Sequence, residues 1–117
     1  MQLNVFGEKL TPCCLNPLTG WQRDGLCSFY NNDKGMHLVC VVVNAEFLQF
    51  SKSAGNDLST ATDNFPGLKP GDRWCLCVSR WLEAFRADQA PLIILSATSI
   101  QVLEYIPLPI LQQMAYE

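Results

Sequence analysis

The sequence has few charged residues and no surplus of basic ones. Charged side chains make up 16% of the 117 residues, and the formal net charge is −3. No lysine and arginine cluster is present, so the composition argues against nonspecific nucleic-acid binding and against an anionic membrane surface. The longest mainly aliphatic run, residues 38–43, is too short to span a bilayer. We therefore expect neither nucleic-acid nor membrane partners.

A targeting segment and a metal-binding motif are also missing. The first ten residues, MQLNVFGEKL, lack a basic segment followed by an apolar one, which predicts no signal peptide. A cytoplasmic location follows, where the six cysteines are expected to be reduced. No C-x2-C pair occurs, and the pairs Cys13-Cys14 and Cys75-Cys77 are unlike those of tetrahedral zinc sites. We expect no metal or cofactor; zinc is the alternative, because the ligand types suit it.

Common catalytic motifs are absent as well. The sequence has no G-x-S-x-G, no P-loop, no G-x-G-x-x-G and no H-E-x-x-H. It has one histidine, so a hydrolytic triad would have to use His37 as its base. These absences leave the reaction and the ligand unspecified.

What the sequence does contain is typical of one globular domain over residues 1–117. Hydrophobic residues make up 49% of the chain, enough to form a core. The nearly continuous apolar run at 37–43 predicts a strand buried on both faces. Asn44 is placed to cap a helix over 45–54, and Gly55 to end it.

Residues 65–85, FPGLKPGDRWCLCVSRWLEAF, contain the strongest helix pattern. Two Pro-Gly turns precede Asp72, which can act as an N-cap. Apolar side chains then recur at three- and four-residue steps, which predicts one amphipathic helix over 73–87. The alternative is a strand over 73–78 with a shorter helix capped by Ser79. On a strand Cys75 and Cys77 would share a face, whereas on a helix they would lie roughly 200° apart.

The last third of the chain predicts a hairpin and a closing helix. Residues 92–97 and 102–106 have the pattern of paired strands, and a proline at 107 or 109 suits the first turn of a helix over 108–115. Two polar segments, 7–36 and 56–71, show no periodicity and are expected to be loops. The predicted fold is α+β, with a small, mostly antiparallel sheet packed against two to three helices and two long polar loops.

This connectivity predicts where a site would lie. If helix 45–54 returns along strand 37–43, then His37, loop 56–71 and the start of helix 73–87 meet at one end. We expect a small-molecule pocket there, suited to an anion or to catalysis. Cys75 is the candidate nucleophile and His37 its base. The candidate ligand-binding residues are Arg23, Asp24, Asn56, Asp57, Ser59, Asp72, Arg73 and Trp74.

Each of these residues also has a purely structural explanation. Asp72 can cap a helix, Asp57 and Ser59 can stabilise turns, and Cys75 can pack as a small hydrophobic residue. The alternative function is therefore a thiol-rich protein-interaction or structural module, stabilised by zinc if a metal is bound. Trp21, Trp74 and Trp81 could mark an interface or simply fill the core.

Several motifs together are similar to one known family. GLKPGDRWCLC is followed by RW-x-EA and preceded by GNDLST, and NVFG, PLTG, RDG and FxxFSKxxGNDLST match elsewhere. Across nearly the whole chain the sequence resembles the domain-of-unknown-function family 2237, small proteins found widely in bacteria. Cys14 and Leu26 stand where relatives often differ. The resemblance implies a shared fold and no assigned activity.

Overall fold

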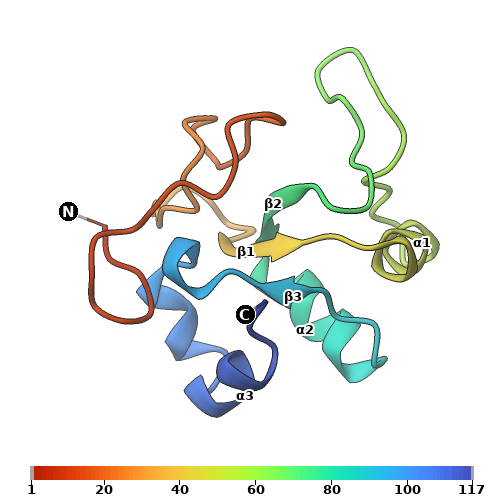
Figure 1. Cartoon of the computed structure of the whole chain (residues 1–117). Coiled ribbons are helices and arrows are strands. Elements are labelled where there is room, and N and C mark those ends of the chain that lie inside the picture. The colour runs from red at the N-terminus through yellow and green to blue at the C-terminus, as the bar shows by residue number, and fades with distance from the viewer. Residues whose placement is uncertain (1, 117) are drawn as a thin grey trace.

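A computed structural model describes residues 2–116, which form three strands, three α-helices and two short 3-10 helices (Figure 1). In chain order the elements are β1 (His37–Val42), α1 (Ala45–Ser53), β2 (Arg73–Cys77), α2 (Val78–Arg86), β3 (Leu92–Ile93), η1 (Leu95–Ala97), η2 (Ile100–Glu104) and α3 (Leu108–Gln113).

The three strands form one antiparallel sheet in the order β2-β1-β3. The central strand β1 is HLVCVV, and its four middle residues are fully buried. Helix α2 packs against β1 and β2, and α1 packs beside α2. The predicted α+β class with a small antiparallel sheet is confirmed.

The first strand and helix lie close to the predicted ranges. Strand β1 ends at Val42, one residue before the predicted end. Asn44 caps α1 as expected, because its Oδ1 accepts a hydrogen bond of 2.7 Å from the backbone N–H of Phe47. Gly55 follows the helix with φ +92°, a conformation that costs a glycine little.

The prediction of a single helix over 73–87 is wrong in its first five residues. Residues 73–77 form β2, and the helix begins at Val78. The alternative of a strand is therefore correct, although the N-cap is Cys77 and not Ser79. The carboxylate of Asp72 accepts a hydrogen bond of 2.8 Å from the N–H of Lys69, so it closes the Pro-Gly turn and does not cap a helix. Pairing with β1 satisfies the backbone of 73–77 and overrides the local helical pattern.

The predicted hairpin of 92–97 and 102–106 is also wrong. Only Leu92 and Ile93 are in a strand, and residues 100–104 form the 3-10 helix η2. The side chain of Ser99 accepts a hydrogen bond from the N–H of Gln101 and so begins η2. Val102 and Ile106, spaced by about one helical turn, are both fully buried. The closing helix is present as α3, shorter than predicted.

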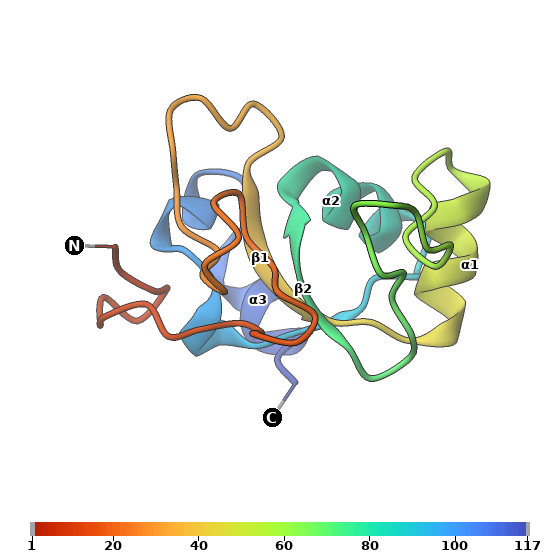
Figure 2. The same ribbon diagram turned by 90° about the horizontal axis from the view of Figure 1, so that it is seen from above.

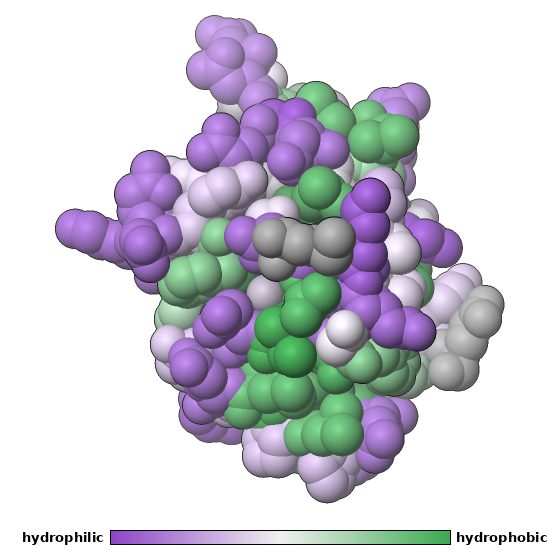
Figure 3. Space-filling model, turned by 90° about the vertical axis from the view of Figure 1, so that its left-hand side faces the viewer, coloured by the Kyte–Doolittle hydropathy of each residue, from purple (hydrophilic) through white to green (hydrophobic). Residues whose placement is uncertain are grey.

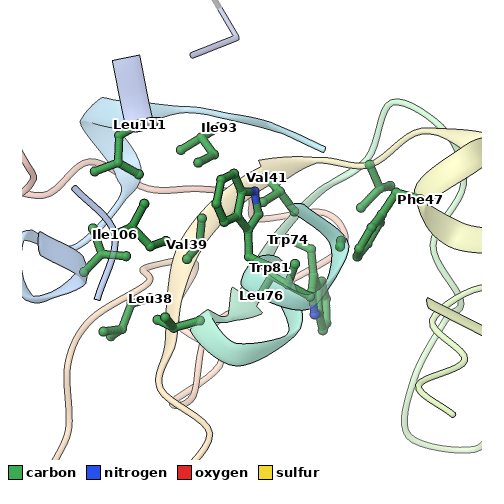
Figure 4. Close-up of a cluster of buried hydrophobic side chains, with 14 of the residues drawn as sticks. Leu38, Val39, Val41, Phe47, Trp74, Leu76, Trp81, Ile93, Ile106 and Leu111 are labelled. Atoms are coloured by element: carbon green, nitrogen blue, oxygen red, sulfur yellow. The ribbon is translucent and has the colours of Figure 1, made fainter. Parts of the chain in front are cut away.

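The core forms where α2 meets the sheet and the C-terminal segment (Figure 4). Trp81 of α2 is fully buried in the same hydrophobic cluster as Val39, Val41 and Ile93. Its indole N–H donates a hydrogen bond of 3.1 Å to the carbonyl oxygen of Pro91, so the one polar atom of the side chain is satisfied. Trp81 is therefore a core residue and not part of a binding surface.

Two disulfides attach the early loop to the sheet. Cys40 of β1 and Cys75 of β2 are opposite each other in the ladder; Cys40 is bonded to Cys13 and Cys75 to Cys27. The expectation that all six cysteines are reduced is therefore wrong for these four, while Cys14 and Cys77 have free thiols. In two perpendicular views, the early loop and the loop 56–71 lie on either side of β2 (Figures 1 and 2).

The surface is mixed in character. Figure 3 shows one face on which a hydrophobic patch is bordered by hydrophilic side chains. Within residues 2–116, no helix has both the length and the apolar character needed to cross a membrane.

Candidate functional site

A hollow of about 370 Å³ lies between the early loop, the loop 56–71 and the sheet. Four separate parts of the chain line it, and its walls combine aromatic rings with charged groups. The lining residues are Gly20, Trp21, Arg23, His37, Asp57, Leu58, Asn64, Phe65, Trp74 and Cys75. We refer to it as the His37 hollow.

Five of the predicted site residues line this hollow. They come from both loops and from both long strands of the sheet. The sequence-based expectation that the two polar loops meet at the His37 end of the sheet therefore agrees with the geometry at Arg23, His37, Asp57, Trp74 and Cys75.

The other predicted residues do not line the hollow. Arg73 pairs with Val42 at the opposite end of the ladder and lines a different hollow of about 260 Å³. Asp72 lines a third one, next to Pro17. These positions follow from the antiparallel strand: because β2 runs opposite to β1, its last residue and not its first lies beside His37.

Three more of the predicted residues have local structural roles. Asp24 accepts a hydrogen bond of 3.1 Å from the N–H of Leu26. The backbone carbonyl oxygen of Asn56 accepts a hydrogen bond from the hydroxyl of Ser51, which closes the end of α1. Ser59 donates both its N–H and its hydroxyl to Asp57. The structural explanation therefore accounts for the side-chain contacts of Asp24 and Ser59 and for the backbone contact of Asn56.

Arg23 is held against an aromatic wall of the hollow. Its guanidinium carbon lies 5.2 Å from the centre of the Trp74 ring, and one terminal nitrogen donates a hydrogen bond of 2.7 Å to the carbonyl oxygen of Gly20. The residue has φ +55°, so the backbone adopts a conformation that is uncommon for a non-glycine residue. These contacts orient the cation and leave its other N–H groups available to a ligand.

Asp57 is the only acidic residue among those that line the hollow. Hydrogen bonds from the hydroxyl of Thr60, and then from the backbone and side chain of Ser59, lower its pKa from 3.8 to about 2. The group is therefore ionised at neutral pH. Because these bonds use its two oxygens, the carboxylate mainly organises the loop.

His37 is fixed by a buried carboxylate that the sequence analysis did not select. One oxygen of Asp33 lies 2.8 Å from Nδ1 of the ring, and the other accepts a hydrogen bond of 2.9 Å from the backbone N–H of His37. The Asp33 side chain is only 1% exposed, so these bonds compensate for the burial of a charged group. Because a carboxylate can only accept, Nδ1 is the donor in this pair, and the bond fixes the orientation of the ring. The Trp21 ring stacks on the imidazole with centres 5.9 Å apart.

The free thiol of Cys77 lies on the strand next to this imidazole. Cys77 is the direct cross-strand partner of His37. The turn at Gly35 lies against both side chains: a Cβ placed there would be 2.9 Å from Cε1 of His37 and 3.3 Å from Sγ of Cys77. Only glycine fits this turn without displacing the pair.

The surroundings of His37 strongly favour its protonated form. The pKa is raised from 6.5 to about 9, and the interaction with the neighbouring Cys77 side chain is the largest cause. Partial burial acts in the opposite direction, while the charges of Cys77 and Asp33 and the hydrogen bond with Asp33 raise the pKa further. At neutral pH, the hollow therefore contains two cations, Arg23 and His37, and one anion, Asp57.

Cys75 has a different chemical state from the one expected. It is 1% exposed and its sulfur is bonded to Cys27, so it has no thiol to act as a nucleophile. The sulfur atoms of Cys13, Cys27 and Cys75 lie within 4.8 Å of one another, but all three are in disulfides. A thiolate metal ligand needs a free sulfur, so this cluster in its bonded form provides none.

Asp33 and Cys77 were missed for different reasons. Asp33 lies four residues before the only histidine, with Gly35 between them, and that short spacing was a usable signal. Cys77 was assigned to the core face of a helix that starts five residues later than predicted. Its position opposite His37 depends on the pairing of two strands far apart in the sequence.

Comparison with known proteins places these residues in a family without an assigned activity. Residues 3–115 match the family described as "Uncharacterized protein conserved in bacteria (DUF2237)". No curated protein matches the chain. The chemistry must therefore be argued from this chain's own residues.

Proposed function

The chain belongs to the bacterial family DUF2237, whose members are uncharacterised, and we propose that it is a small-molecule-binding or catalytic domain with its site in the His37 hollow. The preferred ligand is a small anion with a flat apolar part. The proposal keeps the pocket predicted from the sequence but moves it from the start of a 73–87 helix to the end of the β1–β2 ladder.

The charge of the hollow is the observation that carries this proposal. Two cations, Arg23 and protonated His37, line it. The one carboxylate that lines it, Asp57, is engaged in its own loop, and Asp33 is buried behind His37. Arg23 is already oriented by Trp74 and by the carbonyl of Gly20, so binding an anion would cost little side-chain entropy.

The aromatic walls suggest the rest of the ligand. Trp21 and Phe65 line the hollow together with Trp74, and Phe65 packs edge-on against Trp74 with ring centres 5.2 Å apart. Flat apolar groups stack favourably on such rings. A volume of about 370 Å³ is at the small end of the range for ligand pockets.

Thermal unfolding with phenyl phosphate as the probe tests the proposal, with inorganic phosphate as the comparison without a ring. We expect phenyl phosphate to raise the melting temperature of the wild type more than inorganic phosphate does. At a probe concentration of about 100 times Kd the stabilisation is about 2.7 kcal/mol. Arg23→Gln should abolish the effect.

Arg73→Ala is the matched control. Arg73 is an exposed arginine like Arg23 but lines a different hollow, so this variant should keep the full stabilisation. Equal loss in the two variants, or no stabilisation of the wild type by either probe, would remove the anion site.

A further inference from the structure

We infer that Cys77 is a nucleophilic thiol and that it attacks the carbonyl carbon of acyl compounds. His37 is the imidazolium that stabilises its thiolate and gives a proton to the leaving group, and Asp33 is the residue that positions His37. The inference deepens the function proposed above, because His37 belongs both to the hollow and to this thiol–imidazole pair. The reactivity of the thiol itself does not depend on anion binding, so the two can fail separately.

The arrangement has the three parts that an activated nucleophile requires. The thiol and the imidazole are neighbours across the ladder and both face the turn at Gly35, and Nδ1 of that imidazole is held by a buried carboxylate. The second bond of Asp33, to the backbone N–H of His37, fixes the ring relative to the strand that carries it. Cys77 and His37 are cross-strand partners, so the rigid ladder sets their separation.

Of the six cysteines, only Cys77 has this environment. Four are bonded in the two disulfides, and the other free thiol is Cys14. Cys14 has no imidazole of its own, because the single histidine of the chain is the cross-strand partner of Cys77. Cys14 and Cys77 are both half-buried, so exposure alone does not distinguish them.

The start of α2 adds donors for a developing negative charge. Cys77 is the N-cap of this nine-residue helix, and its side chain makes no capping hydrogen bond. The N–H of Val78 is bonded to the carbonyl oxygen of Met36, which anchors the helix start next to His37. The following N–H groups have no partner within the helix and favour an anion at this end.

The reaction takes place in two balanced steps. In the first, Cys77 has lost its thiol proton to solvent and the His37 imidazolium stabilises the thiolate. Sγ forms a bond to the carbonyl carbon, and the bond to the leaving group breaks as that group takes a proton from the imidazolium. The products are a thioester on Cys77, a neutral His37 and the free alcohol, phenol or thiol. In the second, the neutral imidazole takes a proton from the water that attacks the thioester, which yields the carboxylic acid and restores the thiolate beside the imidazolium.

Alkylation by iodoacetamide without reductant tests the activation directly. Because the other four cysteines are in disulfides, only Cys14 and Cys77 react, and each site is read by peptide mass mapping. At neutral pH we expect Cys77 to react at least about tenfold faster than Cys14, and His37→Gln to slow Cys77 by about a hundredfold, the low end of the range for a positioned base. Cys14→Ser should leave the rate at Cys77 unchanged.

p-Nitrophenyl acetate tests the acyl step. We expect one acetyl group per chain, mapped to Cys77, with a burst of p-nitrophenol that is absent in Cys77→Ser and retained in Cys14→Ser. Asp33→Asn should shift the pH profile of the burst along with the His37 pKa, a readout that a merely structural role would not move. Equal alkylation of Cys14 and Cys77, or acetylation that His37→Gln leaves unchanged, would overturn the inference even if phenyl phosphate binds.

Discussion

The titration of His37 is the most direct test of the geometry around the free thiol. The chain has a single histidine, so one imidazole resonance reports it without ambiguity. We expect a pKa of about 9 in the folded protein instead of 6.5. The cause is that Cys77 and Asp33 stabilise the imidazolium more than partial burial destabilises it.

The expected effect on stability follows from this shift. At 1.36 kcal/mol per pH unit, the rise corresponds to about 3 kcal/mol in favour of the imidazolium. The ring is 31% exposed, so solvent screening reduces this to about 2 kcal/mol. Because the folded-state pKa is raised, the stabilisation is complete below about pH 6.5 and is lost as the pH rises towards 9. Relative to His37→Gln, the wild type should lose that amount of unfolding free energy between about pH 6 and about pH 9.5.

Two variants separate the causes in the NMR titration. Cys77→Ser should lower the His37 pKa more than Asp33→Asn does, because the interaction with Cys77 is the largest cause of the shift and those with Asp33 are smaller. Cys14→Ser is the control and should leave the pKa at about 9. A wild-type pKa at or below 6.5, or a Cys77→Ser value equal to that of the wild type, would refute the proposed contact between thiol and imidazole.

Further predictions concern the fold that holds this pair. A thiol assay on the unfolded, unreduced protein should count two thiols, and six after reduction. In urea denaturation, Cys40→Ser should lower the unfolding free energy by about 3 kcal/mol, because the lost disulfide joins residues 27 positions apart in the sequence. Asn44→Ala should lower the unfolding free energy by about 1 kcal/mol in the same assay, since it removes the cap of α1. No change in the unfolding free energy would mean that the cap is not formed. Trp81→Ala should cost about 3–5 kcal/mol by emptying the core, and a loss under 1 kcal/mol would contradict its full burial. Gly35→Ala should displace the His37 ring and slow alkylation of Cys77 while changing no charge; an unchanged rate would argue against the close approach at this turn.

Local chemistry predicted the elements that depend on adjacent residues. The apolar run of β1 predicted a strand buried on both faces, and its four middle residues are buried. The cap at Asn44 and the left-handed Gly55 depend on side-chain and backbone preferences within a few residues, so α1 was predicted within one residue. The two polar loops were also expected to meet where strand 37–43 begins, and residues of both loops line the His37 hollow.

For residues 73–77, the local sequence pattern does not distinguish a strand from a helix. RWCLC can alternate as a strand or begin the helical stripe that continues to Trp81, and nothing within those five residues separates the two patterns. The ladder with β1 decided for the strand, because only a partner that is distant in sequence could satisfy those backbone groups. Residues 102–106 are ambiguous in the same way, because the burial of Val102 and Ile106 is compatible with a 3-10 turn as well as with a strand.

The sequence by itself determined the fold class, the central strand with its helix, and the end of the domain at which polar side chains gather. Only the tertiary structure decided the pairing of four cysteines in two disulfides and the placement of Asp33 and Cys77 next to His37. The physical reason is that local propensities act over a few residues, whereas a disulfide or a thiol–imidazole contact depends on distances between segments. Those distances are set by strand pairing and loop closure, which no short stretch of sequence specifies alone.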